Sequence, residues 1–174
     1  MIKRALRTFS IWCINNIFAG TRFFGVKRKL LKLADIPVGK NTKVVGPIYI
    51  GGVAKLTIGD NSWIGKNMEI LGNGSVTIGD GCDIAPLVTF ATGSHIISTN
   101  PKRRAGEGIS FEINIENGCW IGVNTIITNN INIESGSVVG ACSLVNKTIS
   151  ENTVCFGVPA KEHRKIETDE EGLD

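Results

Sequence analysis

A six-residue spacing of apolar, mostly β-branched residues runs through most of the chain and constrains its fold more than any other feature. The longest run consists of Ile115, Ile121, Ile127, Ile133, Val139 and Val145. A helix repeats every 3.6 residues and a strand every two, so neither alone produces this spacing. Each hexad therefore predicts a short extended segment and a corner, with one side chain pointing inward. The expected fold class is an all-β solenoid.

Three earlier runs keep the same spacing: Val38, Val44, Ile50 and Leu56; Ile58, Ile64, Ile70 and Val76; and Ile78, Ile84 and Phe90. Glycine often follows the apolar residue, and Asn, Asp or Gly comes next, which suits corners that need positive φ. Three hexads predict a triangular coil of about 18 residues. The similar segments 56–60 and 76–80 start 20 positions apart, so a two-residue bulge is expected at 71–75.

The period fails between Phe90 and Ile115, where residues 94–108 are polar and include Asn100-Pro101 and two glycines. Insertions in a solenoid form loops on one face, where binding sites commonly lie. We therefore predict a solenoid body over 36–158 with a protruding loop at about 92–112. The charged residues 159–174 predict a short C-terminal helix and a frayed tail.

Residues 1–35 lack the repeat and show two apolar-rich segments with basic edges, which we interpret as two helices. An open first coil would leave strand edges in water, so these helices are expected to form a cap. Residues 1–40 also hold nine Lys/Arg and one acidic residue, whereas 41–174 hold ten and fifteen. A second interpretation, compatible with the first, is a basic amphipathic surface in weak contact with anionic lipid on the inner membrane face.

Composition further limits the kinds of protein to which this chain can belong. The 174 residues fit one domain, and no window approaches the ~18 apolar residues of a membrane span. The five cysteines are odd in number and form no C-x-x-C pair, which predicts buried free thiols, Cys142 among them, in a reduced cytoplasmic setting. Nucleic-acid binding is not expected, because the solenoid part is acidic overall and the basic segment lacks an interleaved aromatic platform.

Four further motifs occur in a fixed order: segment 78–90 leading to His95, Cys119-Trp-Ile-Gly122, Val139-Gly-Ala-Cys-Ser143 and Gly157-Val-Pro-Ala-Lys161. Together with the hexads they resemble the hexapeptide-repeat acyltransferases over about residues 36–166. The closest groups are the galactoside and maltose acetyltransferases and the polysaccharide O-acetyltransferases. The resemblance implies a left-handed parallel β-helix, a homotrimer with active sites between subunits, and acetyl-CoA as donor.

His95 stands at the entrance of the loop, where the resemblance places the catalytic residue. A sugar hydroxyl is a weak nucleophile at neutral pH, and an imidazole can take its proton during attack on the thioester and then protonate the departing thiolate. His163 falls in the charged tail and is interpreted as a surface residue. A metal is not expected, because carbonic anhydrases of this solenoid type need three imidazoles and the chain has two histidines.

The resemblance also implies residues that bind acetyl-CoA: Trp120, Val123, Ala141, Asn146, Lys147, Lys161 and Arg164. Val123 and Ala141 would line the pantetheine arm, and the polar and basic residues would meet the nucleotide end. The alternatives are solvated surface cations and, for Trp120, packing alone.

The acceptor side departs from the galactoside-type pattern, with Gly65 in place of an Asn and Asn73 in place of an acid. Arg103 and Arg104 on the loop, together with Asn73, are candidates for contact with an anionic acceptor sugar, although a solvated basic loop explains the two arginines equally well.

The expected function is transfer of an acetyl group from acetyl-CoA to a sugar hydroxyl of a capsule, O-antigen or exopolysaccharide unit. Two alternatives stay open. N-acetylation of a nucleotide-linked amino sugar would need the same base, and a non-catalytic structural solenoid would have no use for His95 beside a long loop.

Overall fold

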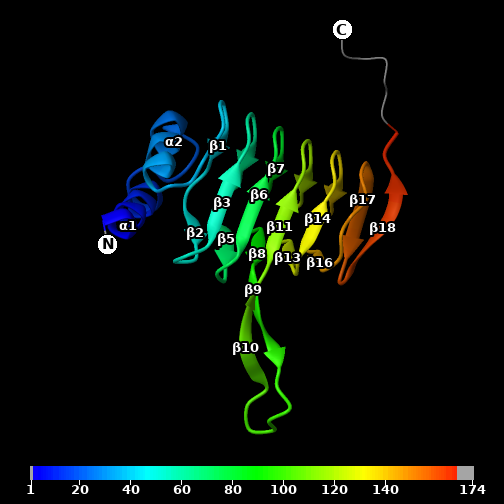
Figure 1. Ribbon diagram of the computed structural model, residues 1–174. Helices are drawn as coiled ribbons and strands as arrows, with labels where there is room; N and C mark the ends of the chain where they lie inside the picture. Colours follow the sequence, from blue (N-terminus) through cyan, green and yellow to red (C-terminus); the bar gives the residue numbers. More distant parts are fainter. Residues whose placement is uncertain (1, 168–174) are drawn as a thin grey trace.

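The computed structural model describes residues 2–167, and in it the chain winds into a β-solenoid with helices at one end and a long hairpin projecting from its middle (Figure 1). Two helices, α1 (Ile2–Asn16) and α2 (Phe24–Leu33), precede the coils. The hairpin consists of β9 (Gly93–Ile97) and β10 (Ala105–Ser110). The expected solenoid class is confirmed.

Three sheets form the sides of the coils, and we call them sheets A, B and C. Sheet A contains β1 (Lys43–Val44), β4 (Trp63–Ile64), β7 (Asp83–Ile84), β12 (Trp120–Ile121), β15 (Val138–Val139), β17 (Thr153–Gly157) and β18 (Ala160–Lys165). Sheet B contains β2 (Ile48–Ile50), β5 (Met68–Leu71), β8 (Thr89–Ala91), β13 (Ile126–Thr128) and β16 (Leu144–Val145). Sheet C contains β3 (Lys55–Ile58), β6 (Ser75–Ile78), β11 (Glu112–Ile115) and β14 (Ile131–Ile133). The chain runs from C to A to B, so the coil has a C–A, an A–B and a B–C edge.

The inward side chains form the core that the six-residue spacing predicts. Ile121, Ile127 and Ile133 have 0% exposure and Val139 has 1%. Adjacent coils stack them in register, with Ile121 beside Val139 and Ile127 beside Val145. Each coil thus buries one apolar residue per hexad against the next, and the prediction is confirmed.

Residues with positive φ form stacks along two edges. Along the A–B edge they are Asn67, Leu87, Asn124 and Cys142, with φ between 56° and 62°. The side chain at such a corner points away from the core, so Cys142 is exposed and its predicted burial is wrong. The thiols of Cys13, Cys82, Cys119 and Cys155 are buried, as expected.

Extra residues enter at the B–C edge. Leu56 pairs with Val76 in the early coils, a step of 20, whereas Ile113 pairs with Ile131 in the later ones, a step of 18. The bulge expected at 71–75 lies at this edge, where Gly72 has a φ of 101°. The hairpin leaves the solenoid at the same edge one coil later, between β8 and β11.

The two helices cover the open end of the first coil. Ile14 of α1 and Leu31 of α2 are fully buried against it. The Asn15 side chain donates to the Ile48 carbonyl oxygen (2.8 Å) and accepts from the Ile48 N–H (2.9 Å). Arg7 donates to the Ala54 carbonyl oxygen (2.6 Å). These bonds satisfy backbone groups that an edge strand would otherwise leave open.

The C-terminal helix expected at 159–174 is wrong where the structure describes that segment. Residues Ala160–Lys165 form β18, which pairs antiparallel with β17. The charge pattern alone is compatible with a helix, but β17 would be the free edge of sheet A, and pairing with β18 covers it. His163 is exposed on this strand, with its ring stacked on Phe156 at 3.6 Å. Residues 168–174 of the expected tail lie outside the described part.

Candidate functional site

The hairpin is anchored to the solenoid by Thr92, a residue that sequence analysis did not single out. Its buried hydroxyl donates to the Leu71 carbonyl oxygen (2.9 Å) and accepts from the Gly74 N–H (3.1 Å). Its backbone carbonyl accepts from the Phe111 N–H (2.8 Å). A side chain on Gly74 would overlap the Phe111 carbonyl oxygen, so this close approach requires glycine. The sequence signal that could have identified Thr92 is its position as a polar residue directly after the last regular hexad before the loop.

His95 lies on β9, three residues beyond this anchor. It pairs across the hairpin with Gly108, and the space beside Gly108 is open. The imidazole is exposed, and the neighbouring strand offers no side chain opposite it. A substrate atom can therefore approach His95 from the side of β10. The sequence shows two glycines in the loop, but it does not identify Gly108 as the residue opposite His95.

Three other candidate residues lie along the same B–C edge. A Cβ added at Gly93, at the hairpin base, would lie 3.7 Å from the Asn73 backbone nitrogen, so Asn73 is close to the strand of His95. Asn146 and Lys147 follow β16, two coils farther along, which corresponds to about 10 Å at ~4.8 Å per strand. The Asn146 carbonyl accepts from the Asn129 side chain (3.2 Å). The edge therefore gathers Asn73, His95, Asn146 and Lys147.

The two loop arginines lie at the far end of the hairpin. The Arg104 guanidinium donates to the carbonyl oxygens of Ser98 (3.2 Å) and Thr99 (3.3 Å), which stabilises the hairpin turn. Arg104 lies opposite Ser98, whose N–H donates to the Arg104 carbonyl oxygen (2.9 Å), and the Arg103 N–H donates to the Asn100 carbonyl oxygen (3.2 Å). Ser98 and Asn100 are three and five residues beyond His95, which corresponds to roughly 10 and 17 Å at ~3.3 Å per residue. The structure does not bring Arg103 and Arg104 to the His95 of their own chain.

The remaining candidates lie away from the B–C edge. Val123 and Ala141 occupy successive corners of the A–B edge, where the Cys142 N–H donates to the Val123 carbonyl (2.9 Å). Trp120 is exposed on the outer face of sheet A, between Asp83 and Val138. Lys161 and Arg164 are exposed on β18. One side of the coil, about six residues and at most ~20 Å, separates Val123 from the edge that carries His95.

No family model matches the chain. Galactoside O-acetyltransferase of Escherichia coli is 37% identical over 140 residues, which cover 80% of this chain and 68% of the relative. WcaF of Escherichia coli, provisionally assigned as an acetyltransferase of colanic acid biosynthesis, is 32% identical over 146 residues, 80% of this chain and 75% of the relative. A hexapeptide-repeat acetyltransferase from Vibrio cholerae, solved with acetyl coenzyme A, has a TM-score of 0.80 at 30% identity, covering 96% of this chain and 88% of that one.

The chain belongs to the hexapeptide-repeat acyltransferases. The resemblance carried by the hexads and the ordered motifs is thereby confirmed. As in the other members, its solenoid is a left-handed parallel β-helix. This handedness could not have followed from periodicity alone.

The buried cysteines of this acyltransferase belong to the core. Cys82 and Cys119 continue an inward ladder of small polar residues at the C–A edge, and their thiols donate to the carbonyl oxygens of Glu116 (3.0 Å) and Glu134 (3.2 Å). Burial raises the pKa of the Cys155 thiol to about 11. A thiol held protonated is a poor nucleophile. Residues 2–167 also contain no group of three or more side chains placed to hold a metal ion.

A polar groove of about 490 Å³ lies beside the hairpin base, and sequence analysis missed it. It is lined by Ser110, Glu112, Asn114, Asn130, Ile131, Asn132 and Thr148. The Asn114 amide donates to the Asn132 side-chain oxygen (3.1 Å), which joins neighbouring coils. Amide and hydroxyl groups of this kind suit contact with sugar hydroxyls. The sequence signal that could have revealed this groove is the Asn-rich stretch 129–132, which follows the B–C edge from which the loop also leaves.

Proposed function

We propose that this acetyltransferase moves the acetyl group of acetyl-CoA to a hydroxyl group of a sugar in a lipid-linked or polysaccharide unit, with His95 as general base. The observation that carries the proposal is His95 on a hairpin fixed by Thr92, with open space beside Gly108. The galactoside O-acetyltransferase relative favours a hydroxyl acceptor over an amine. Because acetyl-CoA is the donor, we place the reaction in the cytoplasm.

In the proposed reaction, an imidazole nitrogen of His95 takes the proton of the sugar hydroxyl as its oxygen attacks the thioester carbonyl carbon. The tetrahedral intermediate carries its negative charge on the former carbonyl oxygen, for which backbone N–H groups are the expected donors. When the carbon–sulfur bond breaks, the imidazolium returns its proton to the departing sulfur. The products are the O-acetyl sugar and CoA with a free thiol.

The donor is proposed to lie along the A–B edge. Val123 and Ala141 present small apolar surfaces at successive corners there, which suits the pantetheine arm. Lys161 lies on β18 just after the turn at Val158-Pro159, and Arg164 lies farther along the strand. Both are exposed and can pair with phosphate groups.

A homotrimer would complete this site. The A–B edge and His95 lie on different edges of one chain, so a second copy that presents its A–B edge to the hairpin would bring donor and base together. The surfaces support such contacts, because exposed apolar residues occur on sheet B, at the A–B edge and on the hairpin: Tyr49, Leu71 and Ile126; Leu87; and Ile96, Ile97 and Ile109. The outer face of sheet C presents polar residues instead, such as Thr57, Thr77 and Asn114.

The test is release of free CoA from acetyl-CoA with a panel of neutral, amino and anionic sugars. Turnover with hydroxyl acceptors is expected, and His95→Ala should lower kcat/KM by about 10²–10⁴-fold while its oligomeric state stays unchanged. Retained turnover in His95→Ala would refute the base assignment. A matched change on the same strand, Ile97→Ala, separates loss of the imidazole from loss of the hairpin surface.

Mixed trimers test the placement of the donor. A subunit with His95→Ala and a subunit with Lys161→Ala and Arg164→Ala should each show low activity at limiting acetyl-CoA. If each site uses His95 of one copy and the cations of another, mixing the two should restore part of the activity, because some sites then receive both intact edges. No recovery in mixtures would contradict the inter-subunit site.

A further inference from the structure

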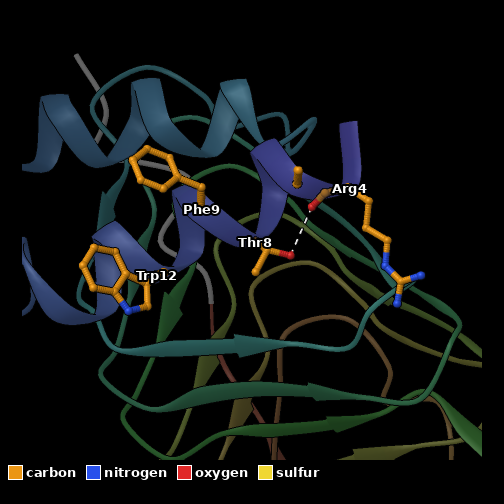
Figure 2. Close-up of a pocket in the computed structure, with 5 residues that line it drawn as sticks. Arg4, Thr8, Phe9 and Trp12 are labelled. Atoms are coloured by element: carbon orange, nitrogen blue, oxygen red, sulfur yellow. Dashed lines mark hydrogen bonds between the residues drawn. The ribbon is translucent and has the colours of Figure 1, made fainter. Parts of the chain in front are cut away.

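An aromatic surface on α1 faces solvent on the side away from the first coil. Phe9 is 57% exposed and Trp12 is 53% exposed, and their rings stack with centroids 6.5 Å apart at 20°. Figure 2 shows both rings projecting from α1, with Thr8 between them and Arg4, whose side chain extends away from the rings. Together with Ala5 these residues line an apolar hollow. Two large aromatic side chains left in water on one helix face are costly unless something covers them.

The capping role does not account for this surface. The face of α1 that meets the solenoid uses Ile14, Asn15 and Arg7, which are buried or bonded to the first coil. Phe9 and Trp12 lie outside that set. A helix with a polar outer face would cap the coil equally well, so the aromatic residues need a separate explanation.

The two helices that carry this surface have charges of one sign, and Arg4 lines the hollow itself. Neither α1 nor α2 contains an acidic residue. Arg7, Lys27 and Arg28 are occupied with backbone carbonyls, whereas the exposed cations are Lys3, Arg4, Arg22, Lys29 and Lys32. Asp35 approaches Lys3 at 3.9 Å, with both side chains more than four-fifths exposed, so it offsets little of this charge.

We infer that the Phe9–Trp12 face of α1 docks on a bilayer surface that contains anionic lipid. Aromatic rings beside Lys and Arg on an amphipathic helix match the boundary between acyl chains and acidic headgroups. A second copy of the same face is a poor occupant, because it would bring two cationic surfaces together without a counter-charge. The helix lies on the membrane and does not cross it: none of the described helices is long and apolar enough to span a bilayer.

Vesicle flotation of the full chain tests this inference without reference to acetyl transfer. Binding is expected to phosphatidylcholine vesicles that contain phosphatidylglycerol, with release at 1 M salt, where the Debye length is about 3 Å. Phe9→Ser with Trp12→Ser should lower binding by at least about tenfold. Phe156→Ser, which removes an exposed aromatic residue from β17 at the opposite end of the solenoid, should leave binding unchanged. Equal binding to phosphatidylcholine alone, or equal binding by the double variant, would overturn the inference.

Tryptophan fluorescence locates the contact. In a variant that keeps Trp12 and carries Trp63→Phe and Trp120→Phe, anionic vesicles should shift the emission to shorter wavelength, and lipids brominated along the acyl chain should quench it. Absence of quenching would exclude insertion. If Phe9→Ser with Trp12→Ser instead changed the oligomeric state by light scattering, a second copy would be the occupant and the inference would be wrong.

Discussion

The solenoid body and the β9–β10 hairpin differ in what keeps them ordered. The coils of the body bury their inward residues against neighbouring coils or, at the first coil, against the two helices, whereas the side chains of β9 and β10 are almost all exposed. The body therefore supplies the free energy of folding, and the hairpin depends on its own strand pairing and on the anchor at Thr92. Catalytic and recognition residues can vary on such a hairpin without cost to the core, which is how a rigid scaffold commonly carries a site.

The largest effect is expected from a polar group in the body core. Ile127→Asn places an unpaired amide at a position with 0% exposure and should cost about 4–5 kcal/mol or more, enough to abolish cooperative unfolding in thermal circular dichroism. Thr77→Asn is the control, since Thr77 is exposed on the polar outer face of sheet C and lies outside the apolar surface proposed to contact a second copy. It should cost less than about 1 kcal/mol. Equal losses in the two variants would contradict the inward assignment.

Removing most of the hairpin should leave the body folded, in contrast to the polar substitution in the core. Residues 95–108 can be replaced by Asn-Gly, because Ser94 and Ile109 are paired and a two-residue turn can join them. Acetyl transfer should disappear, while the body should keep its far-UV circular dichroism and melt within a few degrees of the intact chain. A body that no longer folds would show that the hairpin contributes to the core.

The anchor should show an intermediate effect on both stability and activity. Thr92→Val leaves the Gly74 N–H and the Leu71 carbonyl without the buried hydroxyl, which should cost about 1–3 kcal/mol in urea unfolding. It should also lower kcat, because His95 is positioned through this anchor. Thr128→Val is the control: Thr128 occupies the same edge in the next coil, where no hairpin leaves, and makes one longer bond, to Ala91 (3.3 Å). Similar losses of kcat in the two variants would exclude a positioning role for Thr92.

A smaller effect is expected from the cations of β18. Lys161→Ala with Arg164→Ala should raise the KM for acetyl-CoA several-fold while kcat changes much less, because a phosphate contact exists equally in ground and transition states. Higher salt should raise the KM of the unchanged protein in the same direction. An unchanged KM would mean that both residues are solvated surface cations.

The smallest effect is expected from chemical modification of the cysteines, which compares a residue at an exposed corner with residues in the core. In the native protein a thiol reagent should modify Cys142 quickly, and Cys13, Cys82, Cys119 and Cys155 should react only on unfolding. Cys142→Ser should abolish the fast phase without a change in melting temperature. Rapid modification of a second thiol would show that a coil opens locally.

Two errors of sequence interpretation have the same cause. Cys142 was predicted to be buried because its residue type favours cores, but it occupies the positive-φ corner that Asn67 and Asn124 fill in other coils. Residues 159–174 were predicted from their charges to form a short helix and a frayed tail, but the edge of β17 was open and Ala160–Lys165 pair with it as β18. Residue type and charge are local properties, whereas corner position and edge exposure depend on the stacking of coils.

Sequence alone determined the inward ladder and the place of the insertion that carries His95, because a six-residue period and its interruption are readable without knowing which coils touch. Only the tertiary structure decided which edge carries each residue. It grouped Asn73, His95, Asn146 and Lys147 on one edge, separated them from Val123 and Ala141, and identified Thr92 as the anchor. The physical reason is that neighbours in a solenoid lie 18, 20 or 37 residues apart, depending on bulges and on the hairpin. Contacts between coils therefore follow from backbone register and not from spacing along the chain.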